Sequence, residues 1–184
     1  MGSHPTVTEV RLIGSRAESR ATAFSDWDFQ VATEDFPSVR DALPRLLEPL
    51  EPLVQQWDRL SRRHCWMLIV PGPAKVDLLF PGEPHELEPP WEASAGNLEA
   101  IDAHFWDWML WLKAKEAAGK ADLVARELAK LFDHLLGPLG VEAPPTSLHE
   151  ALAVYRRARE RAERSFGASV RRELEAAVAP ALGR

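Results

Sequence analysis

The chain has 184 residues, which is enough for one moderate domain or two small ones. Hydrophobic residues make up 46% of the sequence and charged residues 27%, so the composition is that of an ordinary globular protein. The formal net charge of −6 argues against a chain that coats nucleic acid through bulk electrostatics.

The first strand and helix patterns lie close together at the start of the chain. Residues 6–14 are predicted to form a strand that ends in Gly14-Ser15. A short polar helix is expected over residues 16–23. Residues 26–32 alternate apolar and polar side chains well enough to predict a second strand.

The next segment predicts a helix and then a pair of strands. Residues 37–58 keep an approximate helical period, with Pro37 in the first turn and later prolines that kink or divide the helix. Residues 64–70 and 75–80 predict two strands, and the Pro-Gly sequence between them favours a tight hairpin connection.

The character of the sequence changes after a proline-rich, acidic stretch at residues 81–90. Beyond it, apolar residues recur at helical spacing and predict helices over 98–112, 123–136 and 148–178. We therefore expect an α+β fold. It would combine a small mixed β-sheet domain flanked by helices, over residues 5–90, with an α-helical bundle domain over residues 91–184.

Cysteine usage and apolar patterning limit the setting and the chemistry. Cys65 is the single cysteine, so no intramolecular disulfide can form, and a reducing, cytoplasmic compartment is expected. No uninterrupted apolar segment approaches the roughly 18 residues that span a bilayer. The six histidines are scattered without the spacing of zinc ligands. We expect neither a membrane span nor a zinc site.

A pair of acidic residues marks the second predicted strand. Successive side chains of a strand point to opposite faces, so Asp26 and Asp28 would project together. Two ionised carboxylates at that separation repel each other, and a divalent cation removes the penalty. Magnesium takes oxygen ligands and binds substrate phosphates, so the pair predicts a magnesium site. A turn or helix cap built on Ser25-Asp26 is the alternative interpretation.

Two further features would complete such a site. Gly14 allows the backbone to approach a phosphate closely, and the Ser15 hydroxyl and the amides after it can donate to phosphate oxygens. Asp77 lies in the apolar strand 75–80 and needs a partner there. If that strand lies beside the strand that carries Asp26 and Asp28, Asp77 reaches the same site. It would serve as a metal ligand, as a proton acceptor, or as both.

Together these residues resemble the signature of the DNA polymerase beta-like nucleotidyltransferase superfamily. The matching elements are Gly14-Ser15, the sequence Ser25-Asp26-x-Asp28, and Asp77 in a later strand. In layout the chain is most similar to the aminoglycoside nucleotidyltransferases and related small bacterial nucleotidyltransferases, in which a helical domain follows the catalytic one. The motif match covers roughly residues 10–32 and 75–80.

The resemblance implies a magnesium-dependent enzyme that moves a nucleoside monophosphate from a nucleoside triphosphate, with ATP the expected co-substrate, to a hydroxyl acceptor. Asp26, Asp28 and Asp77 would be the catalytic residues and would hold Mg²⁺. The candidates for nucleotide binding lie in the first motif: Gly14, Ser15, Arg16 and Ser25. For Arg16, a solvated side chain on a short helix is the alternative to a phosphate contact.

The acceptor and the assembly state stay open at this level. An aminoglycoside-like small molecule fits the layout, a protein hydroxyl fits the minimal enzymes of toxin–antitoxin type, and an RNA end fits least with the acidic charge. A non-catalytic nucleotide-binding interaction module is the alternative outside enzymology. A homodimer formed through the helical part is also open.

Two clusters in the helical part carry weaker indications. Trp106 and Trp111 either belong to the core, as we expect of Phe105 and Trp108, or line a cleft or a dimer contact. The arginines between residues 156 and 164 alternate with glutamates and predict a solvated helix stabilised by intrahelical ion pairs.

Overall fold

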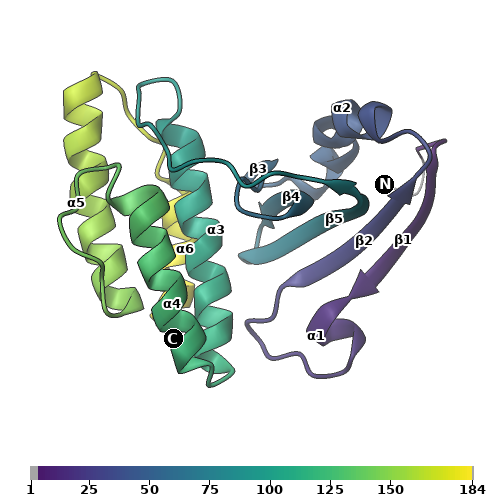
Figure 1. Cartoon of the computed structure of the whole chain (residues 1–184), viewed down its shortest axis with the longest axis horizontal. Coiled ribbons are helices and arrows are strands. Elements are labelled where there is room, and N and C mark those ends of the chain that lie inside the picture. The colour runs from purple at the N-terminus through teal and green to yellow at the C-terminus, as the bar shows by residue number, and fades with distance from the viewer. Residues whose placement is uncertain (1–3, 184) are drawn as a thin grey trace. The chain divides into compact units, whose positions relative to one another are not determined.

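Hydrogen bonds join five strands into one mixed sheet in the first half of the computed structural model, which describes residues 4–183 (Figure 1). The strand order is β1-β2-β5-β4-β3. In chain order the strands are β1 (Val7–Ile13), β2 (Trp27–Thr33), β3 (Val54–Trp57), β4 (Arg63–Val70) and β5 (Ala74–Pro84). The central strands β2 and β5 run parallel, and all other neighbours are antiparallel.

Helix α2 (Phe36–Leu47) covers one face of this sheet. It begins where the Asp35 side chain accepts a hydrogen bond from the backbone nitrogen of Ser38, and Pro37 lies in its first turn. Its buried side chains pack against alternate residues of the strands, and these strand residues are Phe29, Val31, Trp66, Leu68, Val76, Leu78 and Phe80. Because side chains alternate along a strand, Asp28 and Asp77 are directed to the opposite face.

The second half of the chain is helical. Its elements are α3 (Leu98–Ala117), α4 (Ala121–Leu131), a π-helical turn (Phe132–Leu136), α5 (Leu148–Phe166) and α6 (Glu173–Leu182). Helix α3 contacts α4, α5 and α6 and is therefore the centre of this bundle. The chain divides into two compact units between Glu88 and Pro89. With α1 (Gly14–Ala17), the described residues hold six α-helices, which confirms the predicted α+β class.

Four predicted strands are confirmed, but three predicted helices are wrong in extent. The helix expected to reach residue 58 ends at Leu47, and its last residues form β3 instead. A 3-10 turn (Glu48–Leu50) and a left-handed Glu51, with φ of 49°, separate the two elements. Apolar side chains at Val54 and Trp57 fit a helical period as well as a strand, and pairing with β4 decides between them.

The other two helices end early for local reasons. The polar helix expected over residues 16–23 stops at Ala17, and Ser19 already has a φ of 55°. The helix expected over residues 148–178 ends at Phe166, and Gly167, which has a φ of 63°, caps α5. Glycine adopts this left-handed conformation without the steric cost that other residues carry, so it terminates the helix.

A buried polar network ties α5 to its neighbours. Asp102 on α3 accepts hydrogen bonds through Oδ1 from Trp106 Nε1 at 3.2 Å, from the Tyr155 hydroxyl at 2.5 Å and from Arg159 Nη1 at 2.8 Å. The other terminal nitrogen of Arg159 pairs with Glu175 on α6. The prediction of intrahelical pairs along α5 is wrong for Arg159, which is buried and links three helices.

Trp106 and Trp108 both belong to the core, so Trp106 follows the core interpretation and not the cleft or dimer contact. Trp106 is fully buried and is held by its bond to Asp102. Trp111 is partly buried and lies beside Lys115, whose Nζ is 4.8 Å from the centre of the ring. The single cysteine, Cys65, is buried in the sheet. Within residues 4–183, no helix combines the length and apolar character needed to cross a membrane.

Arg159→Met tests the role of this network. The substitution leaves the buried Asp102 without its cation, so we expect the free energy of unfolding to fall by about 3–5 kcal/mol. Arg157 lies on the exposed side of the same helix. Arg157→Met is the matched control and is expected to change the free energy by less than about 0.5 kcal/mol. Urea unfolding measures both values, and equal stabilities would refute the role given to Arg159.

Candidate active site

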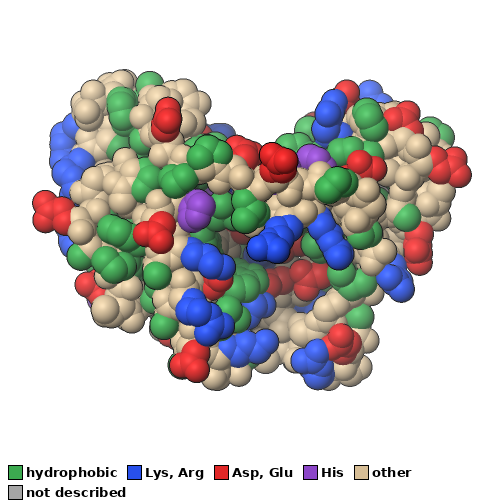
Figure 2. All heavy atoms as spheres, viewed as in Figure 1, with side chains coloured by type: hydrophobic (Ala, Val, Ile, Leu, Met, Phe, Trp, Pro, Cys, Tyr) green, Lys and Arg blue, Asp and Glu red, His purple; other side chains and the backbone are tan. Residues whose placement is uncertain are grey.

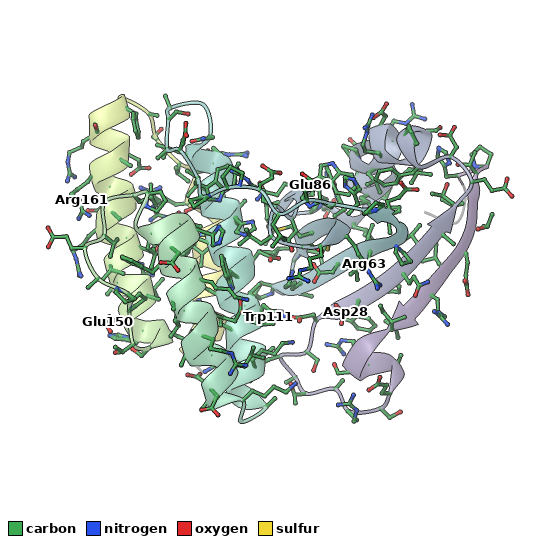
Figure 3. The ribbon with its side chains drawn as sticks, viewed as in Figure 1. Asp28, Arg63, Glu86, Trp111, Glu150 and Arg161 are labelled. Atoms are coloured by element: carbon green, nitrogen blue, oxygen red, sulfur yellow. The ribbon has the colours of Figure 1, made fainter. Side chains whose placement is uncertain are left out.

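The strand register brings two of the predicted carboxylates face to face. On the parallel pair β2 and β5, Asp28 lies directly opposite Asp77. Ile13 at the end of β1 lies opposite Asp28 on the other side. The strand adjacency on which the role of Asp77 depends is therefore confirmed. Figure 3 shows Asp28 near the N-terminal end of β2, beside α1.

Asp26 lies one residue before β2 and not within it, so the expectation that both acids share the strand is wrong by one residue. Its side chain is buried. Burial is the main cause that raises the pKa of Asp77, and the negative charge of Asp26 adds to the rise, so Asp26 lies within electrostatic reach of Asp77. Asp28 and Asp77 share the face of the sheet opposite α2, and Asp26 directly precedes β2 at the same end.

Gly14 lies in close contact with Asp28. A Cβ atom at Gly14 would lie 2.5 Å from Asp28 Oδ2, closer than real contacts allow, and Gly14 has a φ of 70°. Glycine is therefore required here both for the backbone conformation and for the approach of the carboxylate. Ser15 follows as the second residue of α1, and its carbonyl accepts a hydrogen bond from the backbone nitrogen of Arg20 at 2.8 Å.

The segment before β2 is held by the side chain of Arg16. Arg16 Nη2 donates to the carbonyl of Ser25 at 2.6 Å, and its Nε donates to the carbonyls of Ser25 at 3.2 Å and Asp26 at 3.0 Å. Its guanidinium carbon lies 4.1 Å from the centre of the Trp27 ring. The hydroxyl of Ser25 accepts a hydrogen bond from Thr22 N at 2.8 Å. These groups position Asp26, while a nucleotide contact by Arg16 or Ser25 stays a prediction.

Asp77 has a cationic partner that the sequence reasoning missed. Lys75 Nζ donates to Asp77 Oδ1 at 2.6 Å, and the two side chains are only 6% and 15% exposed. Burial raises the pKa of Asp77, and the lysine opposes this effect. Asp26 and Asp58 raise the pKa further. The signal in the sequence was Lys75-x-Asp77, because residues two apart on a strand share a face.

The residue types of the site suit Mg²⁺. The carboxylate oxygens of Asp26, Asp28 and Asp77 are the kind of ligand that Mg²⁺ prefers, and the buried Lys75 supplies positive charge beside Asp77. Over residues 4–183, however, no three His, Cys, Asp or Glu side chains stand in an arrangement that could hold a metal ion. In this arrangement Asp77 is paired with Lys75 instead.

Comparison with known proteins leaves the family undecided. Neither a family model nor a curated protein matches the sequence. The chain is similar to an aminoglycoside 6-adenyltransferase from Bacillus subtilis, with 11% identity, a TM-score of 0.38, and coverage of 98% of this chain and 92% of that one. It is also similar to the polymerase core of TRAMP, an RNA surveillance complex, with 16% identity, a TM-score of 0.36, and coverage of 65% and 36%. These likenesses are too weak to carry a functional argument.

Gly14→Ala tests the contact between Gly14 and Asp28. Gly119 is the matched control, because it has the same φ of 70° but nothing within 4 Å of an added Cβ. Both substitutions carry the cost of a left-handed alanine, about 1–2 kcal/mol. Gly14→Ala must also displace Asp28, so we expect it to lose about 1 kcal/mol more in urea unfolding. Equal losses in the two variants would show that Asp28 moves aside without a cost in free energy.

Arg16→Met tests the attachment of the segment before β2. We expect hydrogen exchange at the backbone amides of residues 22–27 to become faster, because the guanidinium no longer holds the carbonyls of Ser25 and Asp26. Arg20 is an exposed arginine that pairs with Glu18, and Arg20→Met serves as the control with unchanged exchange. If the amides of residues 22–27 exchange as slowly in Arg16→Met as in the unmodified chain, the positioning role of Arg16 is refuted.

Proposed function

We propose that the chain is a magnesium-dependent nucleotidyltransferase that moves a nucleoside monophosphate from a nucleoside triphosphate, with ATP the expected donor, to a hydroxyl acceptor. The observation that carries the proposal is the pairing of Asp28 with Asp77 on adjacent parallel strands, with Gly14 packed against Asp28. The sequence resemblance supports the same reaction through Gly14-Ser15 and Asp26-x-Asp28.

The proposed roles follow from the chemistry of each group. When bound, Mg²⁺ neutralises charge on the phosphate oxygens. Asp26, Asp28 and Asp77 would hold it, and Gly14 and Ser15 would lie against the triphosphate. Asp77 would also accept the proton of the acceptor hydroxyl, a role that suits a carboxylate whose pKa is raised by its burial.

The reaction itself is a displacement at phosphorus. The hydroxyl oxygen of the acceptor forms a bond to the α-phosphorus of the triphosphate, and its proton passes to Asp77. The bond between that phosphorus and the oxygen of the departing group breaks, and pyrophosphate leaves with the electron pair. The chain therefore contributes by holding the reacting groups in place and by receiving one proton.

The acceptor is proposed to be a small hydroxylated molecule of aminoglycoside-like chemistry. The net charge is −6, and on the face shown in Figure 2 the Lys and Arg side chains are mixed with Asp and Glu. Such a surface gives little support to a long nucleic-acid acceptor, whose phosphates favour a continuous basic stripe. A protein hydroxyl is the other acceptor class, and mass spectrometry of the products separates the two.

Asp28→Asn tests the function. We expect release of pyrophosphate from ATP and transfer to a panel of acceptors to fall by at least about a hundredfold, because the amide cannot replace an ionised ligand. Asp26→Asn should behave in the same way. Asp41→Asn is the control, since Asp41 is an exposed residue on α2 that pairs with Arg40, and it should keep full activity. Full activity in Asp28→Asn would refute the mechanism.

A further inference from the structure

Lys75 is a buried cation on the same face of β5 as Asp77. Its side chain is 6% exposed, and an ammonium group so removed from water is stable only beside negative charge. On one side, β4 presents the apolar Ile69 opposite Lys75. On the other side, β2 places Asp28 opposite Asp77, which accepts the hydrogen bond from Lys75. The lysine therefore lies beside the acidic site.

The charges within the site explain why a lysine is placed there. Asp26, Asp28 and Asp77 lie at one end of the sheet, and Asp58 adds a fourth negative charge within electrostatic reach of Asp77. Without a cation these carboxylates repel one another as the chain folds. The bond of 2.6 Å from Lys75 Nζ to Asp77 Oδ1 supplies a positive charge from the chain itself.

We propose that Lys75 is the resident counter-cation of the acidic site and competes with a divalent cation for Asp77. This inference rests on the proposed function, because it takes Asp77 to be a metal ligand. A divalent cation beside the ammonium is repelled by it, so the metal alone binds weakly. A triphosphate brings negative charges that pair with the ammonium and remove this repulsion. Metal and nucleotide therefore bind together more favourably than either binds alone.

Lys75→Met tests the competition without reference to activity. Binding of Mn²⁺, measured by electron paramagnetic resonance in the absence of nucleotide, should become about tenfold tighter than in the unmodified chain. Lys75→Arg keeps the charge and should leave the affinity within about threefold. Lys120→Met removes an exposed lysine and controls for net charge. With a non-hydrolysable triphosphate present, Lys75→Met should bind Mn²⁺ less than about threefold more tightly than the unmodified chain does.

Loss of the buried cation also predicts a change in thermal stability, which tests the inference separately from the Mn²⁺ affinity. Lys75→Met should unfold at a lower temperature without metal and recover more on addition of Mn²⁺ than the unmodified chain does. If Lys75→Met binds Mn²⁺ no more tightly than the unmodified chain, or gains no more stability from it, the inference is overturned. If Asp28→Asn binds Mn²⁺ as well as the unmodified chain does, the metal site of the proposed function fails instead.

Discussion

The parallel pairing of β2 with β5 is the constraint on which the site depends. It places Asp28 opposite Asp77, and a slip of one residue would turn Asp77 into the apolar core beneath α2. Parallel neighbours require a crossover, and residues 34–73 provide it through α2, β3 and β4. The segment that closes the core on one face of the sheet thus also fixes the carboxylates on the other face.

The carboxylates are removed from water to different degrees, because Asp26 is buried and Asp28 and Asp77 are partly buried. Charges removed from water must find partners, and Lys75 supplies one for Asp77. Gly14 leaves room for the Asp28 carboxylate, and Arg16 holds the carbonyl of Asp26 from α1. Each of these residues lies within two positions of an acid or of the Gly14-Ser15 turn, so short segments preorganise the site.

Local patterns predicted the parts of the fold that local forces decide. Strand and turn patterns predicted four strands, and the spacing of Asp26 and Asp28, with Asp77 in a later strand, predicted an acidic site, because strand periodicity fixes which side chains share a face. The strand β3 could not be predicted, since Val54 and Trp57 suit either period until β4 pairs with them. The partners of Arg159 were likewise hidden, because Asp102 and Glu175 lie on other helices.

The buried network around Arg159 and the buried pair of Lys75 with Asp77 differ in how tightly each cation is fixed. Asp102 accepts hydrogen bonds from three side chains, two of them neutral, and Arg159 is fixed between two carboxylates by a planar guanidinium. Moving any member of that network would leave a buried polar group unpaired. Lys75 instead reaches Asp77 with a flexible four-carbon stem and a compact ammonium, which can change partner without rearrangement of the backbone. A cation of the second kind suits the proposed binding of a metal and a triphosphate.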